Sequence, residues 1–310
     1  MTDPIRHFLT LDEFSPAQLA KLIDDTIASK PAYKSGTGAT PLAGQTLALI
    51  FEKPSLRTRV SFEVAMTQLG GATSYLDQAT IGLGKRESVE DVARVLGRMC
   101  DGIMARTFSH ATVEGLAEHA GVPVINGLTD YNHPCQAMAD LVTIREHCGP
   151  LAGKTLAFVG DGNNVARSLA VGCAKLGMNF KLICPTGYEL EAELFERLGA
   201  AYPAVELTMS NAIADVAGAD AIYTDTWISM GQEEEKAERI ATFGPYQVNA
   251  ELMKFAPNAI VLHCLPAYRE MEITDEVFEA HADVIFDEAE NRLHFQRTLV
   301  SALLADGGIG

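Results

Sequence analysis

Short apolar runs alternate with helix-patterned segments along most of the chain. In the first half, four runs have the composition of buried strands, at residues 46–51, 72–77, 102–107 and 122–128. Between them, apolar residues recur at intervals of three and four, as at Phe62, Met66 and Leu69, and this spacing predicts amphipathic helices. Strict alternation of strand and helix predicts a parallel sheet with helices on both of its faces.

The same alternation begins again after Gly149 and Pro150, which end a helix that starts near His133. Strand-like runs follow at residues 155–160, 180–184, 205–209, 221–227, 260–265 and 284–287, and a last helical segment covers about 291–304. The predicted fold class is therefore α/β, with two doubly wound parallel-sheet domains at residues 1–148 and 149–310. Ligands of such sheets bind beyond the carboxyl ends of the strands, so we expect the active site in a cleft between the domains.

The composition limits what the surface can bind. The 310 residues include 24 Lys and Arg against 41 Asp and Glu, which gives a formal net charge of −17. This balance argues against a broad surface for nucleic acid or anionic membrane, but it leaves room for one small positive pocket. No stretch approaches the ~20 apolar residues that span a bilayer, and residues 1–7 lack the apolar core of a signal peptide.

The six cysteines form no C-x-x-C pair. Without a secretory signal they are expected to be free thiols in a reducing compartment, which predicts a cytoplasmic protein. Histidine adjoins cysteine at His147 and His263, but neither pair has the ligand spacing of a zinc site, so we predict no metal.

The first candidate for chemistry is the segment Ser55–Arg59 (SLRTR), which follows the first strand and opens a helix. Free N–H groups at a helix start, together with hydroxyl groups and a guanidinium, make an anion cradle. Because Arg57 and Arg59 point to nearly opposite sides of a helix, we assign Arg57 to the ligand and Arg59 to an ion pair with Glu63. An ordinary polar helix cap is the alternative interpretation.

Three further polar residues end or follow strands of the first domain. Arg106 ends the third strand, and His133 and Gln136 lie where the fourth strand turns into a helix. An arginine at such a strand end faces the ligand, although a surface salt bridge would explain it equally well. His133 is suited to polarising a carbonyl oxygen, and a capping or packing role is the alternative.

In the second domain, the run Gly160–Val165 (GDGNNV) begins like a dinucleotide-binding fingerprint. A nicotinamide-dependent oxidoreductase is therefore the main rival function. Val165 stands at the third glycine position, however, and no acidic residue follows the next strand to hold a ribose. The asparagine side chains suit a polar ligand group better than a pyrophosphate.

Three more segments carry candidate residues. Asp225 and Ser229 follow a strand and can bind an ammonium and a carboxylate together, or the aspartate is simply a helix cap. Cys264 lies in a strand-ending His-Cys-Leu-Pro run, which brings a thiol and two carbonyl groups to the ligand or forms a proline turn with a buried cysteine. Arg292 opens the last helix and can reach a phosphate or cap acidic neighbours.

Taken in order, these motifs resemble the aspartate/ornithine carbamoyltransferase family. The pattern Ser-x-Arg-Thr-Arg, a strand-end arginine, His-Pro-x-Gln, Asp-x-x-x-Ser-Met-Gly and His-Cys-Leu-Pro-Ala extends over about residues 8–304. Ser-Met-Gly, and His-Cys-Leu-Pro in place of His-Pro-Leu-Pro, are similar to the members that act on ornithine. The resemblance implies an enzyme of arginine biosynthesis that transfers the carbamoyl group of carbamoyl phosphate to the δ-amine of L-ornithine, giving L-citrulline and phosphate.

By the same resemblance, the first domain binds carbamoyl phosphate, the second binds ornithine, and the last helix returns to the first domain. The implied carbamoyl-phosphate residues are Ser55, Leu56, Arg57, Thr58, Arg106, His133, Gln136, Cys264, Leu265 and Arg292. The implied ornithine residues are Asn164, Asp225, Ser229 and Met230, and the catalytic residues are Arg57, Arg106, His133, Asp225 and Cys264. No cofactor is implied. The family assembles as homotrimers or multiples of trimers, in which a loop of a neighbouring subunit completes each site.

Two positions depart from the family pattern. Leu56 stands where threonine is usual, and we expect little loss because this position acts through its backbone N–H. Gly82 stands where glutamine or histidine is often found in the neighbouring-subunit loop, so Lys85 or Arg86 would have to supply the donor.

Two other functions remain as alternatives. A non-catalytic relative would have lost residues of the reacting centre, which this chain keeps. A carbamoyltransferase for another amine, such as putrescine or an N-acylated ornithine, is the second alternative. Free putrescine lacks the carboxylate that Asn164 and Met230 would bind, so it is disfavoured.

Overall fold

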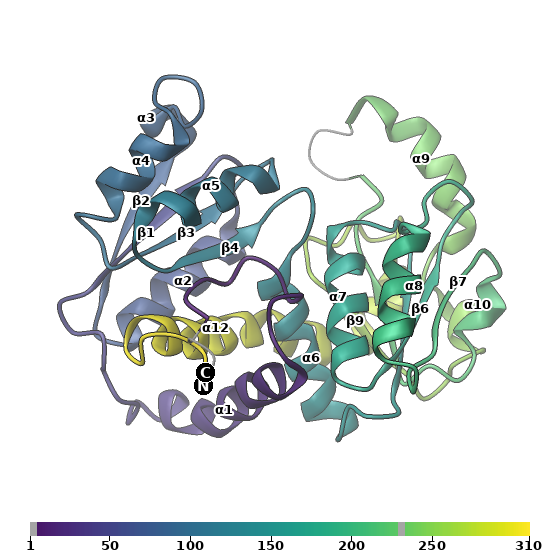
Figure 1. Ribbon diagram of the computed structural model, residues 1–310. Coiled ribbons are helices and arrows are strands. Elements are labelled where there is room, and N and C mark those ends of the chain that lie inside the picture. Colours follow the sequence, from purple (N-terminus) through teal and green to yellow (C-terminus); the bar gives the residue numbers. More distant parts are fainter. Residues whose placement is uncertain (1–4, 229–232) are drawn as a thin grey trace. The chain divides into compact units, whose positions relative to one another are not determined.

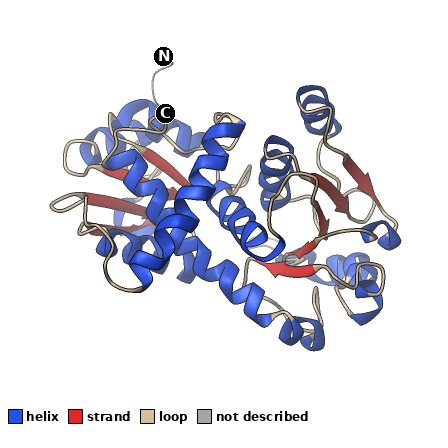
Figure 2. Cartoon of the chain, turned by 90° about the horizontal axis from the view of Figure 1, so that it is seen from below, coloured by secondary structure: helices blue, strands red, loops and turns tan. Residues whose placement is uncertain are grey.

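The computed structural model describes residues 5–228 and 233–310. Contacts within the chain define two compact units, one that extends to Ala139 and includes Asn291–Gly310, and one formed by Asp140–Glu290. Each unit contains a parallel β-sheet with helices packed against it (Figure 1, Figure 2). The predicted fold class of two parallel-sheet α/β domains is confirmed.

The sheet of the first unit has the strand order β2-β1-β3-β4, and every neighbouring pair is parallel. Its strands are β1 (Thr46–Phe51), β2 (Ala72–Asp77), β3 (Gly102–Arg106) and β4 (Val124–Leu128). Its helices are α1 (Pro16–Lys34), α2 (Leu56–Gln68), α3 (Gln78–Ile81), α4 (Val89–Leu96) and α5 (His110–Ala120). The central strands β1 and β3 are buried on both faces, which explains why their sequences are apolar runs rather than alternating patterns.

The sheet of the second unit has the order β7-β6-β5-β8-β9 and is again parallel throughout. Its strands are β5 (Thr155–Val159), β6 (Asn179–Ile183), β7 (Leu207–Ser210), β8 (Ala221–Thr224) and β9 (Ile260–His263). Its helices are α7 (Asn164–Lys175), α8 (Ala192–Ala201), α9 (Lys236–Phe243), α10 (Ala250–Met253) and α11 (Asp275–Ala280). Short 3₁₀ turns lie at η1 (Ile213–Val216), η2 (Glu233–Glu235) and η3 (Gly244–Tyr246).

Two helices, α6 (Pro134–Cys148) and α12 (Ala282–Leu304), each have residues in both units. The unit boundaries therefore fall inside these helices, whereas the sequence pattern placed the boundary at 148/149. The strand predicted at 284–287 is wrong, because these residues form the start of α12. A short apolar run does not distinguish a strand from a buried helix turn, and the burial of Ile285, Phe295 and Leu299 follows the helical spacing.

The part of α12 in the first unit is anchored to α1 and α2. The buried Arg297 donates to Gln68 Oε1 (3.1 Å) and Ser29 Oγ (3.2 Å), and its guanidinium lies 3.8 Å from the centre of the Tyr33 ring. Lys30 Nζ donates to Asn291 Oδ1 at 2.9 Å. Figure 1 shows the yellow α12 alongside the purple α1. These bonds fix the rotation and position of the helix that carries Arg292.

In each sheet, the strand order reverses next to the first strand of that unit. The reversal lies between β1 and β3 in the first unit and between β5 and β8 in the second. Open α/β sheets bind ligands beyond the carboxyl ends of the strands at such a switch point. The predicted site residues follow these strands in both units. Over the part of the chain that the structure describes, no helix combines the length and the apolar character needed to cross a membrane.

Candidate active site

The candidate residues of the first unit begin at the start of α2. Ser55 is the N-cap in an extended conformation, and its Oγ accepts the backbone N–H of Thr58 at 3.3 Å. The following N–H groups of the first turn have no intrahelical acceptor, which is the usual basis of anion binding at a helix start. The side chain of Leu56 is 74% exposed. The exchange of threonine for leucine at this position therefore leaves the backbone of the helix start unchanged.

Two guanidinium groups converge on the hydroxyl of Thr58. Arg106 Nη1, from the end of β3, and Arg292 Nη2, from α12, each lie 3.2 Å from Thr58 Oγ1. Arg292 Nη1 also donates to Gln136 Oε1 at 2.5 Å. Thr58, Arg106, Gln136 and Arg292 are each at most 9% exposed. The first unit thus brings together five of the predicted residues, counting Ser55, in one buried and positively charged group.

His133 belongs to the same group through its electrostatic environment. It is 4% exposed, and burial lowers the pKa of its imidazole well below the usual value, with the charges of Arg292 and Arg106 acting in the same direction. The side chain is therefore neutral at pH 7. A neutral imidazole in this position can hydrogen-bond a carbonyl oxygen but adds no charge.

The neutral state of His133 predicts a contribution to stability that depends on pH. In the unfolded chain the pKa of His133 returns to about 6.5. Below this pH the imidazole is protonated in the unfolded state but stays neutral in the folded state. The free energy of unfolding should then fall by up to about 1.4 kcal/mol per pH unit as the pH drops. His133→Gln should lack this contribution. Urea unfolding between pH 8 and 5 is the measurement, and parallel curves for both proteins would contradict it.

Arg59 lies outside this group, as predicted. Its Nε donates to Glu63 Oε1 at 2.9 Å, and its guanidinium lies 3.9 Å from the centre of the Tyr75 ring. The bond to Glu63 raises the pKa of Arg59. Arg57, two residues earlier, is half-buried. The predicted ion pair between Arg59 and Glu63 is confirmed.

The candidate residues of the second unit are centred on Asp225, directly after β8. Its Oδ1 accepts from the backbone N–H of Thr226 (2.7 Å) and from Cys264 Sγ (3.1 Å). Its Oδ2 accepts from Asn163 Nδ2 at 2.9 Å. The carboxylate is thus held from three directions, and the predicted pair of Asp225 and Cys264 is brought together within the second unit.

Cys264 holds its proton in this environment. Burial raises the pKa of the thiol well above its usual value, and the negative charge of Asp225 acts in the same direction. A protonated thiol is the donor that the bond to Asp225 requires. Cys264 is therefore suited to orienting Asp225 and a neighbouring amine, not to accepting a proton as a resting thiolate.

His263 shapes the loop that carries Cys264. Its Nδ1 accepts the backbone N–H of Leu265 at 3.0 Å, so the ring hydrogen is on Nε2, which donates to Glu272 Oε1 at 3.0 Å. Leu265 has a φ of 57°, in the left-handed region. A leucine is strained there, and the buried His263–Glu272 pair holds the backbone in this conformation. The roles of the Cys264 and Leu265 carbonyl groups towards a ligand stay a prediction.

Asp225, His263 and Cys264 each offer a metal-ligand atom, and these atoms lie within 4.8 Å of one another. Both ring nitrogens of His263 are engaged, however, and Asp225 accepts a bond from the thiol. A cation would have to displace these bonds. The geometry favours a hydrogen-bonded group over a metal centre.

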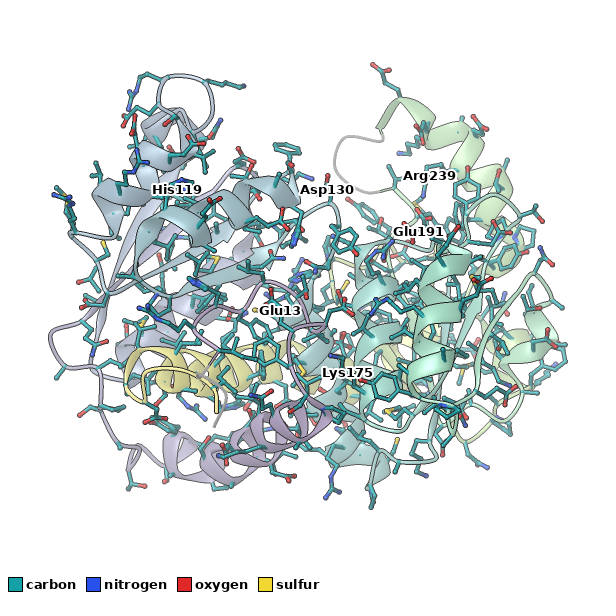
Figure 3. All side chains as sticks on the ribbon, viewed as in Figure 1. Glu13, His119, Asp130, Lys175, Glu191 and Arg239 are labelled. Atoms are coloured by element: carbon teal, nitrogen blue, oxygen red, sulfur yellow. The ribbon has the colours of Figure 1, made fainter. Side chains whose placement is uncertain are left out.

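Two residues of the second unit have contacts that the sequence pattern did not predict. Asn163 caps α7 through bonds from the backbone N–H groups of Val165 and Ala166, and its amide then points at Asp225. Arg239 lies on α9, where Figure 3 labels it. Its guanidinium contacts the carboxylate of Asp161 and the backbone carbonyl of Trp227. Asn163 could have been found as the helix cap beside the selected Asn164, whereas nothing in the sequence links Arg239 to a segment so far away.

Gly162 has a packing role that explains the dinucleotide-like run. A Cβ at this position would lie 2.6 Å from the backbone oxygen of Tyr188, and the Gly162 N–H donates to that oxygen at 2.8 Å. The glycine is required by the close approach of residues 188–190, so it is no sign of a pyrophosphate site. Asn164 is half-buried at the first position of α7. The predicted residues Ser229 and Met230 lie outside the described residues.

Comparison with known proteins gives a consistent result over the whole chain. Residues 6–146 match the carbamoyl-P binding domain, and residues 152–303 the Asp/Orn binding domain, of aspartate/ornithine carbamoyltransferases. The chain is 50% identical over 298 residues to a Rhizobium meliloti protein named ornithine carbamoyltransferase, covering 96% of this chain and 97% of the relative. A relative of the same name from Carboxydothermus hydrogenoformans is 48% identical over 303 residues, with the same coverage of both chains. Among solved structures, ornithine carbamoyltransferase from Pyrococcus furiosus has a TM-score of 0.93 at 44% identity and covers 98% of each chain.

Proposed function

Because this chain belongs to the aspartate/ornithine carbamoyltransferase family, we propose that it transfers the carbamoyl group of carbamoyl phosphate to the δ-amine of L-ornithine. The products are L-citrulline and phosphate. The observation that carries the first half of the proposal is the convergence of Arg106 and Arg292 on Thr58 Oγ1, beside the start of α2. Two buried cations so close together are stabilised when an anion lies between them, and carbamoyl phosphate is such an anion.

In the reacting complex, the phosphate is proposed to lie at the N-terminal turn of α2, with Ser55, Leu56 N–H, Arg57 and Thr58 as its donors. The carbamoyl oxygen gains negative charge as the amine adds to the carbonyl carbon. Arg106, the neutral His133 and Thr58 are the proposed hydrogen-bond donors to this oxygen. Charge that is already fixed in a buried site needs no reorganisation during the reaction, which lowers the barrier.

Ornithine supplies the nucleophile, which must be a neutral amine. By analogy with lysine, the free δ-amine has a pKa near 10, so it reaches the enzyme mostly as the ammonium ion. Asp225 is the proposed group that binds this ammonium, with the Cys264 thiol orienting its side chain. The rate should therefore rise towards alkaline pH. Asn164, Ser229 and Met230 are the proposed holders of the α-amino and α-carboxylate groups.

A colorimetric assay for ureido products tests the function directly. The protein is incubated with carbamoyl phosphate and, separately, with L-ornithine, L-aspartate, putrescine and N-acetylornithine. We expect product with L-ornithine alone. Faster turnover of putrescine or N-acetylornithine would overturn the choice of acceptor. A titration with NADH, followed by its fluorescence, should show no change, and a saturable change would revive the oxidoreductase.

The proposed assembly is a homotrimer or a multiple of trimers. The proposed role is in arginine biosynthesis, and the proposed location is the cytoplasm. The six cysteines are free thiols, which supports a reducing compartment. An exposed apolar stripe on α2 supports assembly: Leu56, Val60 and Val64 are 74%, 46% and 36% exposed. Residues four apart share one face of a helix, so the three side chains form a continuous surface.

The double substitution Val60→Glu with Val64→Glu should dissociate the assembly. Burying two carboxylates in an apolar subunit contact is costly, whereas the same side chains are tolerated on an exposed helix face. Sedimentation equilibrium should give the mass of a trimer for the wild type and of a monomer for the variant. Ile240→Glu, a matched change at a 37% exposed position of the second unit, should leave the mass unchanged. An unchanged mass for the double variant would remove α2 from the interface.

Lys85 is the proposed donor that a neighbouring subunit provides in place of the residue missing at Gly82. Gly82 has a φ of 65°, and a Cβ there would lie 2.8 Å from Arg86 Cβ, which explains the glycine. Arg86 Nη2 donates to the Thr80 carbonyl at 2.9 Å within its own loop, while Lys85 is exposed. This arrangement favours Lys85 over Arg86.

Lys85→Ala should raise the KM for carbamoyl phosphate by about tenfold, the cost of one charge-assisted hydrogen bond. Arg86→Ala should change it by less than about twofold. If the donor comes from another subunit, refolding a mixture of Lys85→Ala and Arg57→Ala chains should restore part of the activity, because some sites then contain neither substitution. No recovery in the mixture would place Lys85 in the site of its own subunit.

A further inference from the structure

Two fully buried carboxyl groups in the second unit remain outside the mechanism above. Asp140 lies on α6 and Glu288 on α12, each is 0% exposed, and their side chains are hydrogen-bonded to each other. Ionised carboxylates are acceptors only, so a hydrogen bond between two carboxyl groups needs a proton on one of them. Burial raises the pKa of Glu288 well above its usual value, and the charge of Asp140 acts in the same direction. The pair therefore holds one proton and one negative charge.

The pair is connected directly to the candidate active site. Glu288 Oε2 accepts the backbone N–H of His263 at 2.8 Å, and His263 immediately precedes Cys264. This bond fixes the end of β9 at the point where the chain leaves the sheet towards Asp225. The other titratable groups that face the pair are Tyr223 on β8, Cys264 after β9 and Cys173 on α7. Burial raises the pKa of all three groups, and the charge of Asp140 adds to this effect, so the phenol and the two thiols stay neutral.

We propose that Asp140 and Glu288 are positioning residues, which share a single proton and hold the His263–Cys264 backbone so that the thiol meets Asp225. One oxygen of Glu288 accepts the backbone N–H of His263, and the Glu288 side chain is also hydrogen-bonded to that of Asp140. A pair that shares one proton satisfies its own hydrogen bonds, whereas two buried carboxylates would repel each other. The kinetic part of this proposal rests on the proposed function, but the proton-sharing part does not.

Glu288→Gln tests the shared proton, because the amide copies the protonated acid. Its NH₂ can donate to Asp140 while its oxygen accepts from the His263 N–H. Glu288→Leu has a similar size and no hydrogen bonds. We expect Glu288→Gln to keep kcat/KM for ornithine within about threefold of the wild type. Glu288→Leu should lose at least tenfold in kcat/KM for ornithine, with the KM for carbamoyl phosphate changed less than twofold.

The pH dependence of the free energy of unfolding tests the shared proton without measuring carbamoyl transfer. In the unfolded chain Glu288 ionises near pH 4.3, while the folded protein keeps the proton to a much higher pH. The folded state therefore binds more protons above pH 4.3, and the unfolding free energy of the wild type falls as the pH rises through this range. Glu288→Gln cannot ionise. The melting temperature of Glu288→Gln minus that of the wild type should increase steadily from pH 5 to pH 8.

The neighbouring Asp287 provides the matched control. It lies on the same helix with its side chain 45% exposed, pairs with His147 at 2.9 Å, and has no bond to the His263 backbone. Asp287→Asn should leave both readouts at wild-type values. Parallel melting curves for Glu288→Gln and the wild type would overturn the shared proton. Wild-type ornithine kinetics for Glu288→Leu would overturn the positioning role. If that variant does not fold, Asp140→Ala, which removes the partner of Glu288, serves in its place with the kinetic expectations given for Glu288→Leu.

Discussion

Asp225→Asn is expected to lower kcat/KM for ornithine by about 10- to 150-fold, because Asp225 is the proposed partner of the ornithine ammonium and a hydrogen bond with a charged group contributes ~1.5–3 kcal/mol. The KM for carbamoyl phosphate should change by less than about threefold. The carboxylate has two oxygens that receive three donors, from Thr226, Cys264 and Asn163. An asparagine must turn its NH₂ group towards one of these donors. The substitution therefore removes the negative charge that the amine needs and also places two donors face to face.

Steady-state kinetics with each substrate varied in turn distinguishes this effect from general damage. The matched control is Asp220→Asn, at the opposite end of β8, where Asp220 accepts from Lys154 Nζ (2.8 Å) and from the backbone N–H of Thr155 (2.9 Å). Asp220→Asn should lower the free energy of unfolding but leave the KM values for ornithine and carbamoyl phosphate close to those of the wild type. Equal losses for the two substrates in Asp225→Asn would reject the assignment of Asp225 to the amine.

Arg57→Ala is expected to raise the KM for carbamoyl phosphate about 10- to 150-fold. A hydrogen bond from a charged group contributes ~1.5–3 kcal/mol, and each 1.4 kcal/mol corresponds to a factor of ten in affinity. Arg57 is the second residue of α2, next to the free N–H groups of the helix start. Loss of its guanidinium leaves the helix cap of Ser55 intact, so the fold should be retained.

Arg59→Ala is the control for the same charge two residues away. Arg59 is paired with Glu63 and packed on Tyr75, so its removal should change the KM for carbamoyl phosphate by less than about twofold. Competitive inhibition by inorganic phosphate measures the same site without turnover. The inhibition constant should rise for Arg57→Ala and stay constant for Arg59→Ala. An unchanged constant in both variants would place the phosphate elsewhere.

Most of the fold could be predicted from the sequence because the relevant interactions are local or periodic. The four strands of the first unit were expected within a few residues of their observed ends, since a strand buried on both faces is a compact apolar run between turns. The strand wrongly predicted at 284–287 also came from reading a compact apolar run as a buried strand. An apolar run of that length fits a strand and a buried turn of helix equally well, and the burial of Ile285 and Glu288 along α12 decides for the helix.

The candidate site was predictable to the extent that its residues follow strands. Arg106 stands at the end of a strand of the first sheet, and Asp225 and Cys264 directly follow strands of the second. Within each sheet, the carboxyl ends of the parallel strands meet at one edge. The contacts of Asn163 with Asp225 and of Arg239 with Asp161 were not predicted, because a helix cap and a distant arginine carry no signal that points to a particular partner. The charge states of His133 and Cys264 were equally hidden, since they follow from burial and from neighbours brought in by the fold.

The amino-acid sequence on its own determined the alternation of strands and helices, and with it the two parallel sheets and the edge of each sheet at which its polar residues collect. It also determined the helix start at Ser55 and the pair of Arg59 with Glu63, because capping and i, i+4 contacts involve only neighbours in the chain. Only the tertiary structure decided that Arg292, 234 residues away, meets Thr58, and that Glu288 meets the backbone of His263. The reason is physical: a hydrogen bond between distant residues depends on how helices pack on a sheet, which no local pattern specifies.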